Sequence, residues 1–152
     1  MNLKHGIIDW DNRLKLGIQV IDNQHEKLIE LTNYLHYACL AGTKTANNIF
    51  IEAAHQAVKY VRYHFTTEEK LMILTGYPKY AFHKKEHDNF TKEVLTLAQK
   101  FNTNSHLIPN RFVHFLKDWV LSHIALCDKE TVEYILTTNY QEKLDQLFSR
   151  AK

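Results

Sequence analysis

The sequence predicts an all-α protein: an antiparallel up-and-down four-helix bundle with an N-terminal arm and a short C-terminal helix. Two observations favour this fold. Glycine occurs 4 times and proline 2 times in 152 residues, which favours long helices over many tight turns. Apolar residues recur at steps of three and four in four long stretches, the pattern of helices that bury one face. We expect one domain over residues 1–152, with the arm at 1–18, the bundle at 19–137 and the closing helix at 139–150.

The arm and the first helix meet near Gly17. Residues 1–18 show no helical period, and their apolar side chains are expected to pin the arm to the core: Ile7, Ile8, Trp10 and Leu14. The first helix is predicted to begin at Gln19 or Asp22 and to end at Leu40. Asp22 either caps its start or places a negative charge at the positive end of the helix. The inward face of this helix is predicted to hold Ile21, His25, Leu28, Thr32, Leu35 and Cys39.

The second helix is predicted from Thr45 to Thr75. The segment Gly76-Tyr77-Pro78 then provides a glycine after the last turn and a proline that suits the start of the next helix. The inward face of the second helix is predicted to hold Phe50, Ala54, Ala57, Val61, His64, Glu68 and Leu71.

The third helix, predicted from Lys79 to Phe101, has the most regular pattern in the chain. Its inward face is predicted to hold Tyr80, His83, His87, Phe90, Val94, Leu97 and Phe101. Pro109 opens the fourth helix, which is expected to continue through Leu136 and whose inner face carries Phe112, Leu116, Trp119, His123 and Cys127. A short closing helix is predicted from Tyr140 to Arg150.

The step from His123 to Asp128 does not fit a regular helix. Five residues turn an α-helix through about 500°, which leaves the two side chains about 140° apart. Both can reach one site only if the helix widens locally into a π-type turn or if Asp128 reaches around the helix. Regular α geometry with the carboxylate facing solvent would refute this prediction.

Polar groups on all four inward faces indicate a metal site. A single His-x-x-x-His pair is weak evidence, and a single buried histidine is usually only hydrogen-bonded. Here five imidazoles and two carboxylates share one predicted core, where they are costly unless something gathers them. Metal ions take neutral imidazole and ionised carboxylate as ligands. The candidate metal ligands are His25, His64, Glu68, His83, His87, His123 and Asp128.

The composition of this ligand set favours two six-coordinate iron ions over one tetrahedral zinc ion. The alternative pattern of ferritin-like di-iron sites, Glu-x-x-His, occurs only at Glu52 and His55, on the wrong face of the second helix. His5, His36, His55, His106 and His114 fall outside the inward faces and are expected at the surface or behind the ligands.

Charge and hydropathy exclude several function classes. The net charge of +2 without a basic tract gives no support for nucleic-acid binding. No apolar run approaches the roughly 20 residues that span a bilayer, so no membrane partner is expected. The N-terminus lacks the apolar run of a secretory signal. Cys39 and Cys127 suit small buried thiols better than a disulfide. We therefore expect a cytoplasmic protein.

At this point the sequence resembles the hemerythrins, specifically the bacterial single-domain members, over nearly its whole length. The tail after Asn139 is longer than in a minimal member, and it either covers the bundle or contacts another protein. The matching motifs are Trp10-Asp11, Gly17-Ile18-x-x-Ile21-Asp22-x-Gln24-His25, His64-Phe65-x-x-Glu68-Glu69, Gly76-Tyr77-Pro78, His83-x-x-x-His87 and Trp119-x-x-x-His123-Ile124-x-x-x-Asp128.

The resemblance implies how the ligands divide between two iron ions, Fe2+ or Fe3+. One iron is held by His83, His87 and His123. The other is held by His25 and His64 and keeps one open position. Glu68 and Asp128 bridge both irons, with an oxo or hydroxo group as third bridge. In the family, O2 binds reversibly at the open position as two electrons move onto it.

The resemblance also implies an apolar ligand pocket, consistent with the need of reversible binding for a dry site. The predicted O2 pocket consists of Ile21, Leu28, Phe65, Trp119 and Val120. The position of Val120 often carries a larger leucine in the family, so the smaller valine is expected to leave a wider gas path and faster autoxidation.

Several functions are open on this reading. The leading one is non-enzymatic O2 storage, delivery to an oxygen-using enzyme, or sensing with a signalling partner; NO and small anions can occupy the same open position. The alternatives are a di-iron enzyme acting on peroxide or nitric oxide, and iron buffering. An enzyme needs a general acid or base, for which Tyr60 and Tyr63 are the nearby candidates.

Overall fold

The structure, a computed structural model, describes residues 6–40, 44–101 and 108–149. Within these ranges every regular element is helical, which confirms the predicted all-α class. The first three long helices are α1 (Gln19–Leu40), α2 (Lys44–Thr75) and α3 (Tyr80–Phe101). The fourth is continuous but has three parts, which are α4 (Ile108–His123), the π-helix η2 (Ile124–Asp128) and α5 (Lys129–Ile135). The chain also contains a 3-10 turn, η1 (Asn12–Leu14), and the closing helix α6 (Tyr140–Ser149).

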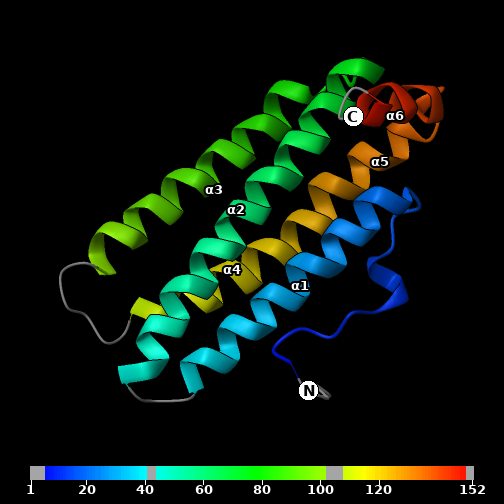
Figure 1. Cartoon of the computed structure of the whole chain (residues 1–152). Helices are drawn as coiled ribbons and strands as arrows, with labels where there is room; N and C mark the ends of the chain where they lie inside the picture. The colour runs from blue at the N-terminus through cyan, green and yellow to red at the C-terminus, as the bar shows by residue number, and fades with distance from the viewer. Residues whose placement is uncertain (1–5, 41–43, 102–107, 150–152) are drawn as a thin grey trace.

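The four long helices lie side by side in the up-and-down order that short connections impose (Figure 1). α1 contacts α2 and α4, and α3 contacts the same two helices, so the four enclose one core. α6 packs on α2 beside the end of α5, at one end of the bundle (Figure 1). None of the helices in the described ranges is both long and apolar enough to cross a membrane.

Local chemistry explains where α2 ends. Gly76 has φ +68°, a left-handed conformation that glycine adopts without steric cost. The amide of Gly76 donates to the carbonyl of Ile73 at 3.2 Å, and that of Tyr77 donates to Met72 at 2.9 Å. This pair of bonds is the Schellman motif, which satisfies the last carbonyls of a helix. The predicted boundaries hold to within a residue or two; α2 begins at Lys44 and α3 at Tyr80.

The N-terminal arm runs along α1 and is tied to it at two points (Figure 1). The side-chain amide of Asn33 exchanges two hydrogen bonds with the backbone of Ile8, at 2.9 and 2.8 Å. The carboxylate of Asp22 accepts from the amides of Leu16 and Gly17, at 2.7 and 3.1 Å. Asp22 therefore fixes the chain that enters α1.

Two apolar clusters fill the bundle. The large cluster contains, among others, Leu28, Val61, Phe65, Phe90 and Val120. The end cluster, toward α6, contains Ile18, Ile21, Leu71, Val132, Ile135 and Leu144. His25 lies between Ile21 and Leu28 on α1, Glu68 between Phe65 and Leu71 on α2, and Asp128 between Ile124 and Val132 on the fourth helix. A polar layer therefore separates the two clusters. α6 contributes Leu144 to the end cluster and so covers that end of the core.

Candidate metal centre

The structure brings all seven predicted ligand side chains into this one polar layer. His25 comes from α1, His64 and Glu68 from α2, and His83 and His87 from α3, while His123 and Asp128 lie at the two sides of the π-helix. Each of the seven is at most 5% exposed. Their ligand atoms form two overlapping groups in which all atoms lie within 4.8 Å of one another.

A π-helix lets His123 and Asp128, five residues apart, face the same side of the helix. Over Ile124–Asp128 the helix widens, and the amide of Lys129 donates to the carbonyl of Ile124, five residues earlier. The wider turn brings the side chain of Asp128 next to that of His123, so that Asp128 Oδ1 lies 3.0 Å from His123 Nε2. Asp128 is 1% exposed, so the predicted π-type turn is confirmed.

The two carboxylates divide their oxygens between two groups of histidines. Glu68 Oε1 lies 3.4 Å from His64 Nε2, whereas its Oε2 lies 3.2 Å from His87 Nε2. Asp128 Oδ2 lies 2.9 Å from the Nε2 of His25, whereas its Oδ1 lies 3.0 Å from that of His83. Each carboxylate therefore faces one group with each oxygen, which is the arrangement of two ligands that bridge two cations.

The layer fits a pair of metal ions because its inner polar atoms lack hydrogen bonds. Buried atoms without a hydrogen-bond partner include the Nε2 atoms of His25 and His64, Oε2 of Glu68 and both carboxylate oxygens of Asp128. Such groups are rare in proteins and destabilise the fold unless something satisfies them. The Nε2 atoms of His83 and His123 also approach to 2.9 Å, which suits two lone pairs that share one cation.

Outer partners fix which nitrogen each imidazole presents to the layer. Nδ1 of His87 lies 2.9 Å from Glu69 Oε1, an ionised oxygen that can only accept. Nδ1 of His83 lies 2.6 Å from Thr131 Oγ1. With Nδ1 protonated and donating outward, Nε2 is left bare and points into the layer. This is the usual way in which proteins orient histidine ligands.

Burial and neighbouring charges shift the protonation equilibria of the layer in different directions. Burial lowers the pKa of His64 well below its ordinary value, and neighbouring His25 adds to this effect. Burial and the charge of Asp128 raise the pKa of Glu68 well above its usual range. Burial opposes ionisation of Asp128, but His123 and its other imidazole neighbours outweigh burial and hold its pKa well below 3.8. A cation in the layer relieves the conflict between the two carboxylates.

Aromatic rings cover one side of the layer. Phe65 stacks on His87 with ring centroids 3.7 Å apart and planes at 7°, and Trp119 stacks on His123 at 4.2 Å and 15°. Leu28, Phe65 and Val120 belong to the large cluster, against which Trp119 packs. The fifth predicted pocket residue, Ile21, belongs instead to the end cluster, toward α6.

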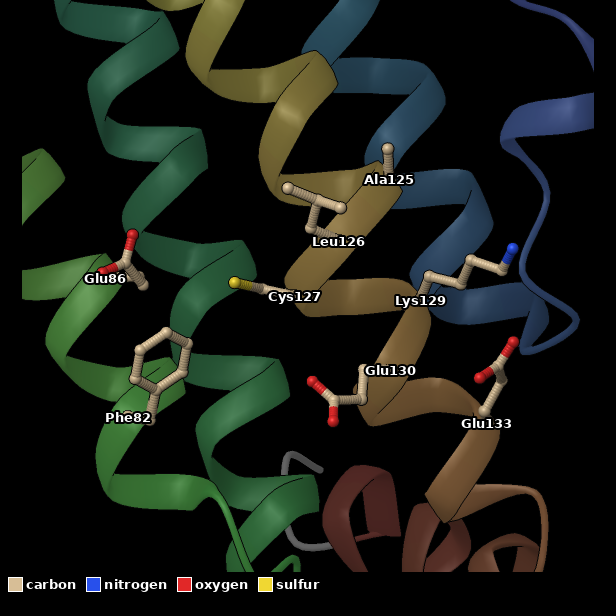
Figure 2. Close-up of a pocket in the computed structure, with 8 residues that line it drawn as sticks. All are labelled: Phe82, Glu86, Ala125, Leu126, Cys127, Lys129, Glu130 and Glu133. Carbon is tan, nitrogen blue, oxygen red and sulfur yellow. The ribbon is translucent and has the colours of Figure 1, made fainter.

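The other histidines and cysteines that the structure describes lie outside the layer. His55 and His114 are exposed and His36 is half-buried, whereas His5 and His106 fall outside the described residues. Cys39 and Cys127 are free and half-buried. Figure 2 shows Cys127, next to Asp128, with its sulfur in an open groove beside α3. Burial raises the pKa of this thiol to about 11, so it stays protonated and is a poor metal ligand.

The hydrogen-bond partners of the imidazole Nδ1 atoms were not predicted from the sequence. Gln24 accepts a hydrogen bond from His64, and Glu69 and Thr131 accept from His87 and His83. All three are polar residues beside or within three positions of a candidate ligand. A search for buried polar neighbours of the ligands could have found them, but their partners become apparent only when the helices are packed.

Comparisons with known proteins agree with this geometry. Residues 16–135 match the profile of the hemerythrin HHE cation-binding domain. A bacteriohemerythrin of Stenotrophomonas maltophilia is 35% identical over 85% of this chain and 82% of that protein. One from Clostridium acetobutylicum is 28% identical over 82% of this chain and 98% of its own length. The crystal structure of a wild-type hemerythrin superposes with a TM-score of 0.73 at 25% identity, covering 85% of this chain and 98% of the other.

Proposed function

Because the chain belongs to the hemerythrin family, we propose that it binds O2 reversibly at a non-haem di-iron centre, for storage, delivery or sensing. The single observation that carries the proposal is the division of carboxylate oxygens. Glu68 and Asp128 each face the His25 and His64 side with one oxygen and the His83, His87 and His123 side with the other. That arrangement supports two metal positions that share both carboxylates.

The protein ligands are unequal at the two positions. His83, His87 and His123 would hold one iron together with the two carboxylates, and His25 and His64 would hold the other. The second position would have one protein ligand fewer and so would leave room for a small molecule. Two irons held here would supply one electron each to a diatomic gas bound at that position. NO and small anions suit the same open position.

The chain's own residues keep the layer dry. Leu28, Phe65 and Val120 are at most 5% exposed, and Trp119 covers His123 with its ring. Water and free protons would promote irreversible oxidation of the iron with loss of the gas in reduced form, so an apolar cover favours release of the gas unchanged. Buried His64 stays neutral and keeps Nε2 available as a ligand.

An enzyme acting on peroxide or nitric oxide is the competing function. It requires a group that exchanges protons near the open position. The ring of Tyr63 is turned toward solvent, 51% exposed. Burial raises the pKa of Tyr60 above its ordinary value of 10.0, which makes that phenol a poor base at neutral pH. These two residues therefore give the enzyme reading no support.

Gas titration tests the proposal. The reduced protein should change its visible spectrum on exposure to O2 and recover the original spectrum under vacuum over repeated cycles. Multiple-turnover consumption of peroxide or nitric oxide would favour the enzyme instead, and an irreversible spectral change would contradict reversible binding.

Ligand variants test the residues. His83→Ala and Glu68→Ala should each lower the iron content and the melting temperature together, because ligation is linked to folding. His55→Ala is the matched control, since His55 is an exposed histidine of α2 and should leave both quantities unchanged. Full iron content in either ligand variant would remove that residue from the ligand set.

A further inference from the structure

The inner ligands alone leave the two metal positions nearly alike in charge. On the proposed ligation, both positions share the same two anionic groups, Glu68 and Asp128. They differ otherwise only in neutral imidazoles, three at one position and two at the other. The groups behind the imidazoles add a further electronic difference to that of the one extra imidazole. This inference rests on the proposed di-iron ligation and concerns those outer groups.

A full negative charge lies behind the position with three histidines. Glu69 Oε1 accepts from His87 Nδ1 at 2.9 Å, and the Glu69 side chain is 23% exposed. A carboxylate that accepts from an imidazole N–H makes the other ring nitrogen a stronger donor to a metal. The charge of Glu69 also raises the pKa of Lys84, but Lys84 is paired with Asp88 at 2.9 Å. The ammonium group of Lys84 therefore offsets the negative charge of Glu69 only in part.

A neutral amide lies behind the position with two histidines. Gln24 is 3% exposed, and its Oε1 lies 2.7 Å from His64 Nδ1. The orientation of this amide is fixed, because its Nε2 donates to Thr67 Oγ1 at 3.1 Å and that hydroxyl donates to the carbonyl of Tyr63 at 3.2 Å. His25 Nδ1 is buried without a hydrogen-bond partner. The charge of Asp22 raises the pKa of His25, but its carboxylate accepts from the backbone amides of Leu16 and Gly17 rather than from the ring. Within the described residues, no charged group is hydrogen-bonded to the Nδ1 of either His25 or His64.

We infer that Glu69 and Gln24 make the two metal positions electronically unequal. Glu69, acting through His87, stabilises Fe3+ at the position held by His83, His87 and His123. Gln24, acting through His64, adds no charge and leaves the other position ferrous. When a one-electron oxidant takes a single electron from the reduced protein, Glu69 directs that loss to the three-histidine position, away from the open one. Both residues are positioning residues, since neither belongs to the seven candidate ligands.

An anaerobic redox titration of Glu69→Gln tests the charge. Glutamine keeps an oxygen that accepts from His87 but removes the negative charge. At the potential where wild type is half-way through its first oxidation, the ratio of Fe3+ to Fe2+ should fall about tenfold, which corresponds to about 59 mV. Glu86→Gln is the matched control. It removes the same charge one residue before His87, from a side chain that lines the groove of Figure 2 and not the polar layer, and should shift the ratio less than twofold.

The identity of the oxidised position is measured on the half-oxidised protein with 15N-labelled histidine. Electron–nuclear double resonance counts the nitrogens bound to Fe3+, and wild type should give three. Gln24→Glu places a carboxylate behind His64 and should move the count toward two. This variant keeps the inference testable if Glu69→Gln fails to fold.

Two results would overturn the inference: equal shifts in Glu69→Gln and Glu86→Gln, or two nitrogens on Fe3+ in wild type. Neither measurement needs reversible oxygenation, so both can be made on a protein that holds two irons but does not release O2. Such a protein would contradict the proposed function and would still test the inference. Metal analysis that finds no iron would contradict both the proposed function and the inference.

Discussion

Replacing Phe65 by leucine should lower the free energy of unfolding more than the same change at Phe112. The two rings are almost equally buried, 5% and 6% exposed, so both variants lose similar apolar contact. Phe65 has three close ring partners, at centroid distances of 3.7 Å to His87, 5.6 Å to Phe90 and 5.4 Å to Trp119. Aromatic pairs contribute about 0.5–1.5 kcal/mol each beyond buried area.

Phe112 serves as the control because it lies in the same large cluster and its ring pairs with Phe50 at 6.1 Å. It also lies eleven residues before His123 on the same helix, about 16 Å along the axis. The excess of two ring partners predicts that Phe65→Leu costs about 1–3 kcal/mol more than Phe112→Leu. Urea unfolding of both variants measures the difference.

The same two variants also show whether the Phe65 ring protects the metal site from water in addition to stabilising the fold. Removing the Phe65 ring opens space against His87 and should admit water, so Phe65→Leu should autoxidise faster than wild type. Phe112→Leu should autoxidise at the wild-type rate. Equal stability losses together with equal autoxidation rates would refute the reasoning, because the aromatic cover would then contribute nothing specific to the site.

Three further predictions concern pH, the gas path and the closing helix. In the iron-free protein, burial opposes protonation of His25 but Asp128 and Glu68 outweigh it, so the pKa is raised above 6.5. The stabilisation from His25 is thus complete below pH 6.5 and is lost as pH rises through the raised pKa, at up to about 1.36 kcal/mol per pH unit; Glu68, whose pKa is also raised, adds to the loss above its ordinary value. The lowered pKa of His64 has the opposite effect, because the unfolded form of His64 loses its proton as pH rises through 6.5, and this adds stability up to about pH 7.5. Urea unfolding of the chelated protein above about pH 7.5 therefore measures the loss, and stability that rises from there speaks against it. Val120→Leu should slow autoxidation in a spectral time course, whereas no change or an acceleration counts against a gas path past Val120. Leu144→Ala, at a site 8% exposed, should cost about 2–4 kcal/mol in thermal unfolding with iron content unchanged; an unaltered melting temperature means that α6 does not cover the core.

Periodicity predicts most of this fold because each long helix buries one face. On the fourth helix, the departure of Asp128 from the spacing of inward residues was as informative about the structure as the regular spacing elsewhere. A carboxylate five residues after His123 can join the inward face through a wider turn or by reaching around the helix, and the structure shows the wider turn, η2. Helix ends were predictable to within a residue or two, because Gly76 and similar signals act locally.

What the sequence could not predict depends on contacts between helices. The amide of Gln24 is oriented by Thr67, 43 residues away, and no periodicity connects the two. Asp22 was expected to act on its own helix, but it accepts from the arm that precedes it. Ile21 shares an inward face with His25, yet it packs toward α6, since residues of one face can lie on either side of a thin polar layer.

The central claim is that two iron ions occupy the polar layer and share Glu68 and Asp128. A crystal diffraction experiment at the iron absorption edge tests it most directly. We predict two anomalous peaks in the layer, one at the Nε2 atoms of His83, His87 and His123 and one between His25 and His64, with both carboxylates reaching both peaks. A single peak, or none at this position in protein that contains iron, would contradict the account.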